Sequence, residues 1–255
     1  MGCRVIAHRG SNKVAPQNTL PAFKQAIAEG TNGFETDVHL TKDGRLVICH
    51  NYTVDHTSDA VGCITSFTLK ELKKMDFGSY FSAEFAHTPL PTIEEFLSLV
   101  APTDADIINI ELKSPPERGM EMVRKTLRAI KNFGVLDRVI ISSFDARILK
   151  TVKSIEPRCK TAFLYPSTNP STHRFEIFPF FTVKRIGADI IHPAYMFVTR
   201  PLVMLAHKLG LQVNVWTVND EPTVKRLLYC GVDGIITDCP GKVRGFIDKA
   251  EKKRK

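Results

Sequence analysis

The sequence lacks the long apolar runs that mark membrane spans and export signals. No segment approaches the roughly 18–20 apolar residues that cross a bilayer, and the N-terminus carries no stretch of signal-peptide length. The start Met1-Gly2-Cys3 does not complete a lipidation motif, because position 6 is Ile rather than Ser or Thr. We therefore expect a cytoplasmic protein without stable membrane insertion.

Two further absences narrow the class of protein. There is no G-x-G-x-x-G or Walker sequence, so a dinucleotide or P-loop nucleotide site is not indicated. No compositional segment resembles a disordered region, and 43% hydrophobic residues suffice for a full core. The cysteines show no close pairing, and in a chain of this size we expect buried free thiols at Cys3, Cys49, Cys63, Cys159, Cys230 and Cys239.

The positive charge is concentrated at the C-terminal end. From position 249 to 255 there are five basic residues and one acidic residue, which supply half of the net charge of +8. Such a tail can contact nucleic acid or an anionic membrane. Cations at the end of a last helix also suit the negative end of its dipole, and we prefer this interpretation. We expect a small-molecule substrate and no nucleic-acid partner, and the sequence does not indicate an oligomeric state.

Short β-branched runs alternate with amphipathic stretches along the chain. The strand-like runs are Arg4–His8, Gly33–His39, Asp106–Leu112, Arg138–Phe144, Lys160–Tyr165, Asp189–His192, Gln212–Val218 and Gly234–Thr237. The helical patterns are Thr19–Glu29, Thr92–Val100, Glu117–Asn132, Asp145–Ile155, Arg174–Ile186, Thr199–Leu209, Glu221–Cys230 and Pro240–Lys249. Eight such units in 255 residues predict one α/β domain, a (β/α)₈ TIM barrel spanning residues 1–255. An open doubly wound sheet is the alternative.

About fifty extra residues separate the second strand from the second helix. Asp43-Gly44 predicts a two-residue hairpin turn, with Lys42 opposite Arg45. That register places His50 opposite Asp37, on the same face of the hairpin. Residues 51–91 are expected to form a small helical insertion over the barrel mouth. Its aromatic residues, Phe77, Tyr80, Phe81 and Phe85, either line an apolar channel or form the insertion's own core, and we favour the core.

Polar residues follow the strands at their C-terminal ends, where barrel enzymes carry their catalytic groups. They are His8-Arg9, Glu35-Thr-Asp37, Glu111-Leu-Lys113, Trp216-Thr217 and Asp238. Residues two apart in a strand share a face, so the members of each Glu-x-Asp or Glu-x-Lys pair point the same way. Three carboxylates at one barrel mouth require a cation. Hard oxygen ligands select Mg²⁺ or Ca²⁺, or Mn²⁺, over zinc.

Each motif has a plainer interpretation when taken alone. A lone Glu-x-Asp is a weak metal signal, Glu111 and Lys113 can be a self-satisfied ion pair, and a single Trp216 more often belongs to a core. Their placement at successive strand ends favours a shared site.

Together these motifs resemble the glycerophosphodiester phosphodiesterases. The matching segments are Ala7-His8-Arg9-Gly10, Pro16-Gln17-Asn18-Thr19, Glu35-Thr36-Asp37-Val38, Asp43-Gly44 leading to His50, Glu111-Leu112-Lys113, Ser143-Phe144, Trp216-Thr217-Val218-Asn219 and Gly231 to Asp238. They run from Arg4 to Pro240 in the family's order, and the insertion after the second strand resembles the family's own.

The resemblance implies roles for individual residues. The acid–base pair is His8 and His50, the divalent ion binds Glu35, Asp37 and Glu111, and the phosphate or substrate contacts are Arg9, Lys113 and Trp216. The chain departs from the family pattern at Gln17, which replaces Glu, at Asn51, which replaces Asp, and at His56, where Arg is frequent. None of these removes a residue of the implied site, so we expect an active enzyme.

The implied reaction is metal-assisted hydrolysis of glycerophosphodiesters to glycerol 3-phosphate and an alcohol. Either water or the neighbouring glycerol hydroxyl serves as nucleophile, and the sequence leaves that choice open. The alternatives are hydrolysis of lysophospholipids or other headgroup diesters at the same site, a Schiff-base lyase using Lys113, and a phosphate binder without turnover. The retained His8 and His50 argue against the last of these.

Overall fold

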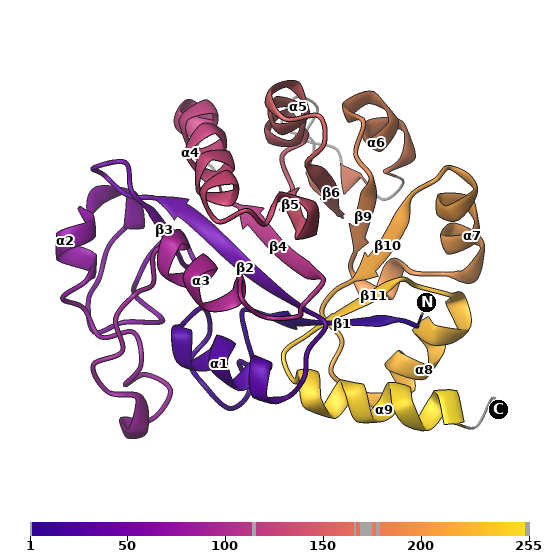
Figure 1. Cartoon of the computed structure of the whole chain (residues 1–255), viewed down its shortest axis with the longest axis horizontal. Coiled ribbons are helices and arrows are strands. Elements are labelled where there is room, and N and C mark those ends of the chain that lie inside the picture. The colour runs from indigo at the N-terminus through magenta and orange to yellow at the C-terminus, as the bar shows by residue number, and fades with distance from the viewer. Residues whose placement is uncertain (1, 114–115, 166, 169–174, 177–178, 253–255) are drawn as a thin grey trace.

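The computed structural model describes residues 2–113, 116–165, 167–168, 175–176 and 179–252. Its parallel strands form a closed barrel (Figure 1), because β1 pairs with both β11 and β2 and completes the order β1-β11-β10-β9-β6-β5-β4-β2. The strands are β1 Arg4–His8, β2 Gly33–Leu40, β4 Ile107–Leu112, β5 Val139–Ser143, β6 Lys160–Tyr165, β9 Ile190–Pro193, β10 Gln212–Val215 and β11 Gly234–Thr237. The predicted TIM barrel is confirmed.

Helices surround the barrel and connect successive strands (Figure 1). They are α1 Leu20–Ala28, α3 Ile93–Val100, α4 Gly119–Asn132, α5 Ala146–Ile155, α6 Phe180–Ile186, α7 Arg200–Lys208, α8 Glu221–Cys230 and α9 Pro240–Lys252. Side-chain oxygens of Thr19, Thr92, Asp145, Thr199 and Asp220 accept backbone hydrogen bonds at five of the helix starts. These N-caps explain why the starts were predictable to within a residue. The predicted start of the sixth helix at Arg174 lies outside the described residues. The prediction is wrong at residues 175–176, because β8 Phe175–Glu176 pairs antiparallel with β7 Ser167–Thr168, and the helix begins only at Phe180.

The main hydrophobic core lies between the strands and the helices. Every residue of β2 is buried, as are the central residues of β1 and β5. The described cysteines are free as expected. Cys49, Cys159 and Cys230 are buried as predicted, but Cys3 and Cys239 are only partly buried and Cys63 is exposed. Among the described residues no helix is long and apolar enough to cross a membrane.

The hairpin after β2 does not have the predicted register. Strand β3, Leu46–Ile48, is antiparallel to β2, and its pairs are Val38↔Ile48, His39↔Val47 and Leu40↔Leu46. The loop therefore contains one residue more than a two-residue turn. Only Gly44 has positive φ (+73°), whereas the predicted turn needs positive φ at Asp43 as well. Asp43 Oδ1 instead accepts hydrogen bonds from the Thr41 hydroxyl (2.6 Å) and the Leu69 amide (3.0 Å).

The insertion after β3 has its own small apolar cluster. Its helical turns are short: η1 Ile64–Ser66, α2 Leu69–Leu72 and η2 Ala83–Phe85. Phe77 is buried with neighbours that include Val54, Ile64, Leu72 and Leu90. Tyr80 and Phe81 are 41% and 37% exposed, so the expected aromatic core contains Phe77 but not these two rings.

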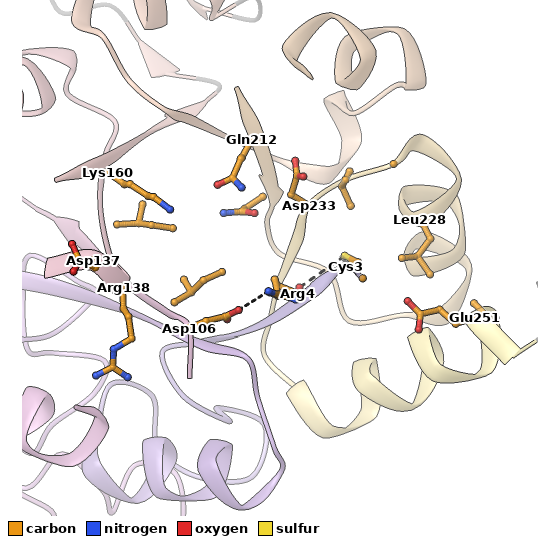
Figure 2. A pocket seen from close by; sticks show the side chains of 17 residues that line it. Cys3, Arg4, Asp106, Asp137, Arg138, Lys160, Gln212, Leu228, Asp233 and Glu251 are labelled. Carbon is orange, nitrogen blue, oxygen red and sulfur yellow. Dashed lines mark hydrogen bonds and ion pairs between the residues drawn. The ribbon is translucent and has the colours of Figure 1, made fainter. Parts of the chain in front are cut away.

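A cavity of about 540 Å³ lies at the N-terminal end of the barrel (Figure 2). Residues just before or at strand starts line it, among them Arg4, Asp106, Lys160 and Gln212. Arg4 and Asp106 form an ion pair of 2.7 Å across it. Barrel enzymes carry their catalytic groups at the opposite, C-terminal end of the strands, so this cavity is not where we expect the catalytic site.

Candidate active site

Three buried carboxylates meet at the C-terminal end of adjacent strands. Glu35 and Asp37 lie two residues apart on β2, and Asp37 pairs in register with Glu111 of β4. One oxygen from each carboxylate lies within 4.8 Å of the others. All three residues are at most 7% exposed. The structure thus brings together the three residues predicted to bind metal.

Mutual repulsion and burial disturb the titration of this cluster. Burial, followed by the charges of Asp37 and Glu111, raises the pKa of Glu35 well above its ordinary value. Burial and the charge of Asp37 raise the pKa of Glu111 to about 7. Burial acts in the same direction on Asp37, but Lys113 and Arg9 outweigh it and hold its pKa below the usual range. The site therefore carries more buried acid than its cations fully neutralise.

The predicted phosphate-binding cations both contact the cluster. Lys113 Nζ lies 2.6 Å from Glu111 Oε1 and 3.1 Å from Asp37 Oδ1. Arg9 Nε lies 3.4 Å from Asp37 Oδ2, and Arg9 Nη1 donates a 2.6 Å hydrogen bond to Gln17 Oε1. Because Gln17 is neutral, it orients the guanidinium without cancelling its charge.

The residues present fit a divalent cation. The donor set consists of three carboxylates, which is the hard oxygen chemistry of Mg²⁺, Ca²⁺ and Mn²⁺. Asn18 fixes the orientation of one ligand, since its Nδ2 donates to Asp37 Oδ2 (2.9 Å) and its Oδ1 accepts from the Thr36 hydroxyl (3.0 Å). A carboxylate held in this way is typical of a metal site's surroundings.

His8 is oriented by an aspartate from the other end of the chain. Its Nδ1 lies 2.6 Å from Asp238 Oδ1, and its Nε2 lies 4.0 Å from Glu35 Oε2. Asp238 also accepts hydrogen bonds from Asn12 (2.8 Å) and Asn219 (2.7 Å). Burial lowers the pKa of His8, and the hydrogen bond to Asp238 opposes that shift. The arrangement leaves Nε2 as the ring atom that faces the carboxylates.

His50 reaches the site by a different path from the one predicted. In the observed register Cys49, rather than His50, lies opposite Asp37. The Cys49 backbone amide donates a hydrogen bond to the backbone oxygen of Asp37 at 2.9 Å. His50 follows one residue later and is near enough to Asp37 to lower the pKa of that carboxyl. Burial lowers the pKa of His50 to about 4. The charge of Asp37 opposes this shift, and the charges of Lys113 and Arg9 add to it. Burial therefore outweighs the attraction of Asp37 for the protonated ring.

A pocket of about 50 Å³ opens beside the carboxylates. Its lining includes His8, Arg9, Glu35, Glu111 and Trp216. The Trp216 ring packs edge-on against Phe144, with centroids 5.8 Å apart and an interplanar angle of 89°. Its Nε1 donates to the backbone oxygen of His192 at 2.7 Å. Trp216 therefore lines the pocket beside the carboxylates.

Several residues of the site were not assigned a role from the sequence. They are Asn12, Asn18, Asn109, Phe144, His192, Asn219 and Asp238. Asp238 and His192 carried the same signal as the predicted residues, a polar side chain at or just beyond a strand's C-terminal end. Asn12 and Asn219 lie in loops, where no strand periodicity indicates the direction of a side chain.

Comparison of the sequence with known protein families gives one match over most of the chain. The sequence model of the glycerophosphoryl diester phosphodiesterase family matches residues 8–242. A glycerophosphodiester phosphodiesterase of Caldanaerobacter subterraneus subsp. tengcongensis is 39% identical over 245 residues, which cover 96% of this chain and 98% of that protein. A protein of the same name from Bacillus altitudinis is 34% identical, covering 94% of this chain and 96% of that protein.

Solved structures with a similar fold include phosphodiesterases. A putative glycerophosphoryl diester phosphodiesterase of Silicibacter pomeroyi superposes with a TM-score of 0.88 at 29% identity, covering 97% of this chain and 94% of that chain. A phosphodiesterase of Oleispira antarctica, in complex with the product sn-glycerol-3-phosphate, superposes with a TM-score of 0.87 at 28% identity and 96% coverage of both chains.

Proposed function

The chain belongs to the glycerophosphoryl diester phosphodiesterase family, and we propose that its barrel mouth hydrolyses glycerophosphodiesters to glycerol 3-phosphate and an alcohol. It is a phosphoric diester hydrolase. The observation that carries the proposal is the cluster of Glu35, Asp37 and Glu111, since Glu35 and Glu111 line one pocket together with His8 and Arg9. Cationic groups are needed to bind an anionic diester, and groups that accept and donate protons are needed to hydrolyse it. This site contains both kinds.

The three carboxylates would hold a divalent ion, Mg²⁺ or Ca²⁺ or Mn²⁺, and that ion would supply Lewis-acid polarisation of a phosphoryl oxygen. Arg9 and Lys113 bind the remaining phosphate charge. Arg9 is suited to this role because its guanidinium presents a planar fork of donors and is steered by the neutral Gln17. Lys113 contributes a compact charge from between Glu111 and Asp37.

His8 and His50 move the protons. In each ring Nδ1 faces an oxygen acceptor, Asp238 Oδ1 at 2.6 Å for His8 and Asn51 Oδ1 at 2.8 Å for His50. Nδ1 therefore carries the hydrogen in the neutral ring, and Nε2 is left to exchange a proton with the substrate. One ring takes the proton of the nucleophile and the other, protonated, delivers one to the leaving oxygen. The two roles belong to the coupled pair.

An assay for released glycerol 3-phosphate tests the proposal. Glycerophosphocholine, glycerophosphoethanolamine and bis(p-nitrophenyl) phosphate are supplied to the purified chain with Mg²⁺, Ca²⁺ or Mn²⁺, and again with excess chelator. We expect glycerol 3-phosphate from the glycerol diesters only when metal is present. If the folded, metal-supplied protein releases none from any diester, the proposed activity is wrong.

Longer-chain diesters such as lysophospholipids are the second candidate, and one contact favours them. The Tyr80 hydroxyl accepts a hydrogen bond from the backbone N–H of Gln17 at 3.1 Å. The Gln17 side chain in turn bonds Arg9, so this aromatic residue of the insertion lies close to Arg9. Tyr80 and Phe81 thus offer apolar surface near the phosphate. Comparing turnover of glycerophosphocholine with that of a lysophosphatidylcholine separates the two substrate classes.

The Schiff-base alternative is not favoured by the surroundings of Lys113. Burial alone lowers the pKa of its amine, but Asp37 and Glu111 outweigh burial and raise it above its ordinary value. A lysine nucleophile needs a neutral amine, and these two carboxylates keep this one protonated.

A further inference from the structure

One fully buried imidazole in the pocket has no part in the proton transfers described above. His192 lies near the end of β9 and lines the same pocket as Glu35 and Glu111. The pairing registers put it in one layer of inward side chains with three others, from alternate strands: Glu35, Ser142 and Ile236. Strands β2 and β9 are four apart in the eight-stranded ring, so His192 faces Glu35 across the barrel axis.

The ring of His192 is held in one orientation. Asn214 Nδ2 lies 3.2 Å from its Nε2, and its backbone oxygen accepts the Trp216 indole hydrogen bond. Burial lowers the pKa of His192 to about 3, so the ring is neutral. Because Nε2 accepts from Asn214, the ring hydrogen lies on Nδ1. That Nδ1 is buried and has no hydrogen-bond partner.

A second residue that lines this pocket has an unpaired hydrogen-bond acceptor. Asn109 donates its Nδ2 to the Ser142 hydroxyl at 3.0 Å, and its Oδ1 is buried without a partner. Buried polar groups are nearly always satisfied, so an unused donor and an unused acceptor in one pocket indicate a missing ligand. The other walls are apolar, formed by Phe144, Leu164, Trp216 and Ile236.

We propose that His192, positioned by Asn214, donates its Nδ1 hydrogen to a hydroxyl of the substrate's glycerol moiety and so determines specificity for glycerol diesters. The inference rests on the proposed function, because it assigns the end of the glycerol away from the phosphorus to this pocket. A hydroxymethyl group combines apolar CH₂ with one hydroxyl, which suits apolar walls with a single donor. A site built to bind a hydroxyl discriminates strongly against the analogue that lacks it, since the buried donor is then left unpaired.

Three substrates with the same leaving group provide the test. One is the p-nitrophenyl diester of glycerol 3-phosphate, and the others are its 1-deoxy and 2-deoxy analogues. We expect the wild-type kcat/KM to be higher on the glycerol diester than on the 1-deoxy analogue, which lacks the hydroxyl farthest from the phosphorus, by about ten- to a hundredfold. His192→Gln retains an amide for Asn214 at the Nε2 position but removes the Nδ1 donor. It should reduce that ratio to near one by lowering kcat/KM on the glycerol diester alone.

Equal losses on all three diesters, or no loss, would overturn the inference while leaving the proposed activity intact. A wild-type enzyme inactive on every diester would count against the proposed activity itself. His192→Asn, which restores a polar group near Nδ1, should recover part of the preference.

A measurement on the unmodified protein covers the case in which these variants do not fold. The His192 Nδ1–H resonance in ¹⁵N-labelled, metal-supplied protein should shift with glycerol 3-phosphate and stay in place with inorganic phosphate or propyl phosphate. An identical shift with all three, or none with glycerol 3-phosphate at saturating concentration, shows that a buried water rather than the glycerol occupies this donor.

Discussion

Buried acid at the barrel mouth couples metal binding to pH. In the metal-free protein the folded-state pKa of Glu111 is about 7, above the ordinary value of 4.5. A group with a raised folded-state pKa favours folding at low pH, and that contribution is lost as the pH rises through 7. Metal binds the ionised carboxylate, so protons compete with it below pH 7.

We therefore expect Mg²⁺ to raise the Tm more at pH 8 than at pH 6, by a few degrees at the higher pH. Thermal unfolding with and without metal at both pH values measures this. Glu111→Gln should remove most of the metal effect, whereas Glu121→Gln, which changes an exposed carboxylate on α4, should preserve it. A metal-induced shift that is equal at both pH values would show that Glu111 is not a ligand.

The two histidines are expected to respond differently to the leaving group. A phenolate leaves without a proton, whereas an alkoxide needs one, so loss of the general acid harms only the alkoxide substrate severely. His8→Ala and His50→Ala, compared on glycerophosphocholine and on a p-nitrophenyl diester, assign the acid and the base. The wild-type pH profile should be a bell with two apparent pKa values that belong to the pair. Near-normal turnover of glycerophosphocholine by both variants would contradict the histidine mechanism.

The strand-end rule predicted the site residues that project from strands and overlooked those whose position depends on contacts. Glu35, Asp37 and Glu111 could be grouped because a strand alternates its faces and parallel strands end together. The Asp238 contact with His8 joins residues 230 positions apart and depends on barrel closure. That contact requires a three-dimensional structure, although both residues were identified as strand ends.

At the level of elements, the hairpin between β2 and β3 shows how one residue changes a register. The Asp-Gly signal located the turn correctly, but local periodicity contained no information on the Thr41 and Leu69 contacts that hold Asp43. The turn accordingly contains three residues, and each residue of β2 pairs with the residue one position earlier than predicted, as Val38 does with Ile48. Helix starts were predictable because their capping residues are local in sequence.

Gly44 is the residue that this turn requires. Its φ of +73° disfavours any Cβ, so Gly44→Ala should lower the free energy of unfolding by about 1–2 kcal/mol. Denaturant unfolding measures the change. Gly245→Ala is the matched control, because that glycine lies inside α9 with open space around its Cβ position and should stabilise by up to about 1 kcal/mol. Unchanged stability in Gly44→Ala would show that the turn tolerates a different conformation.

At the level of the whole molecule, the candidate catalytic groups and the larger cavity lie at opposite ends of the barrel. The C-terminal end carries the carboxylates and histidines, and the larger cavity at the opposite end is lined by the partly exposed ion pair of Arg4 and Asp106 (Figure 2). The alternating pattern predicted the closed barrel, since eight units of this length rarely leave edges open. The cavities were not predictable, because they depend on how side chains from different strands fill the interior.

The basic C-terminus lies beyond the elements that form the site. Its described part ends with α9 on the outside of the barrel (Figure 1). Truncation after Ala250 should leave hydrolysis of a soluble diester within a few-fold of the full chain. Steady-state kinetics of the two forms, with circular dichroism to verify folding, tests this. A large loss of turnover by a folded truncation would assign the tail a part in the reaction.

The most direct test is a metal titration in which bound ion and turnover are measured on the same samples. Metal-free protein receives increasing Mg²⁺, and glycerol 3-phosphate release from glycerophosphocholine is followed at each step. If Glu35, Asp37 and Glu111 form the working site, turnover rises from zero in proportion to the occupancy of one ion per chain. Glu111→Gln should then lose both binding and turnover. Full turnover in the metal-free protein, or normal turnover by Glu111→Gln, would contradict the central claim.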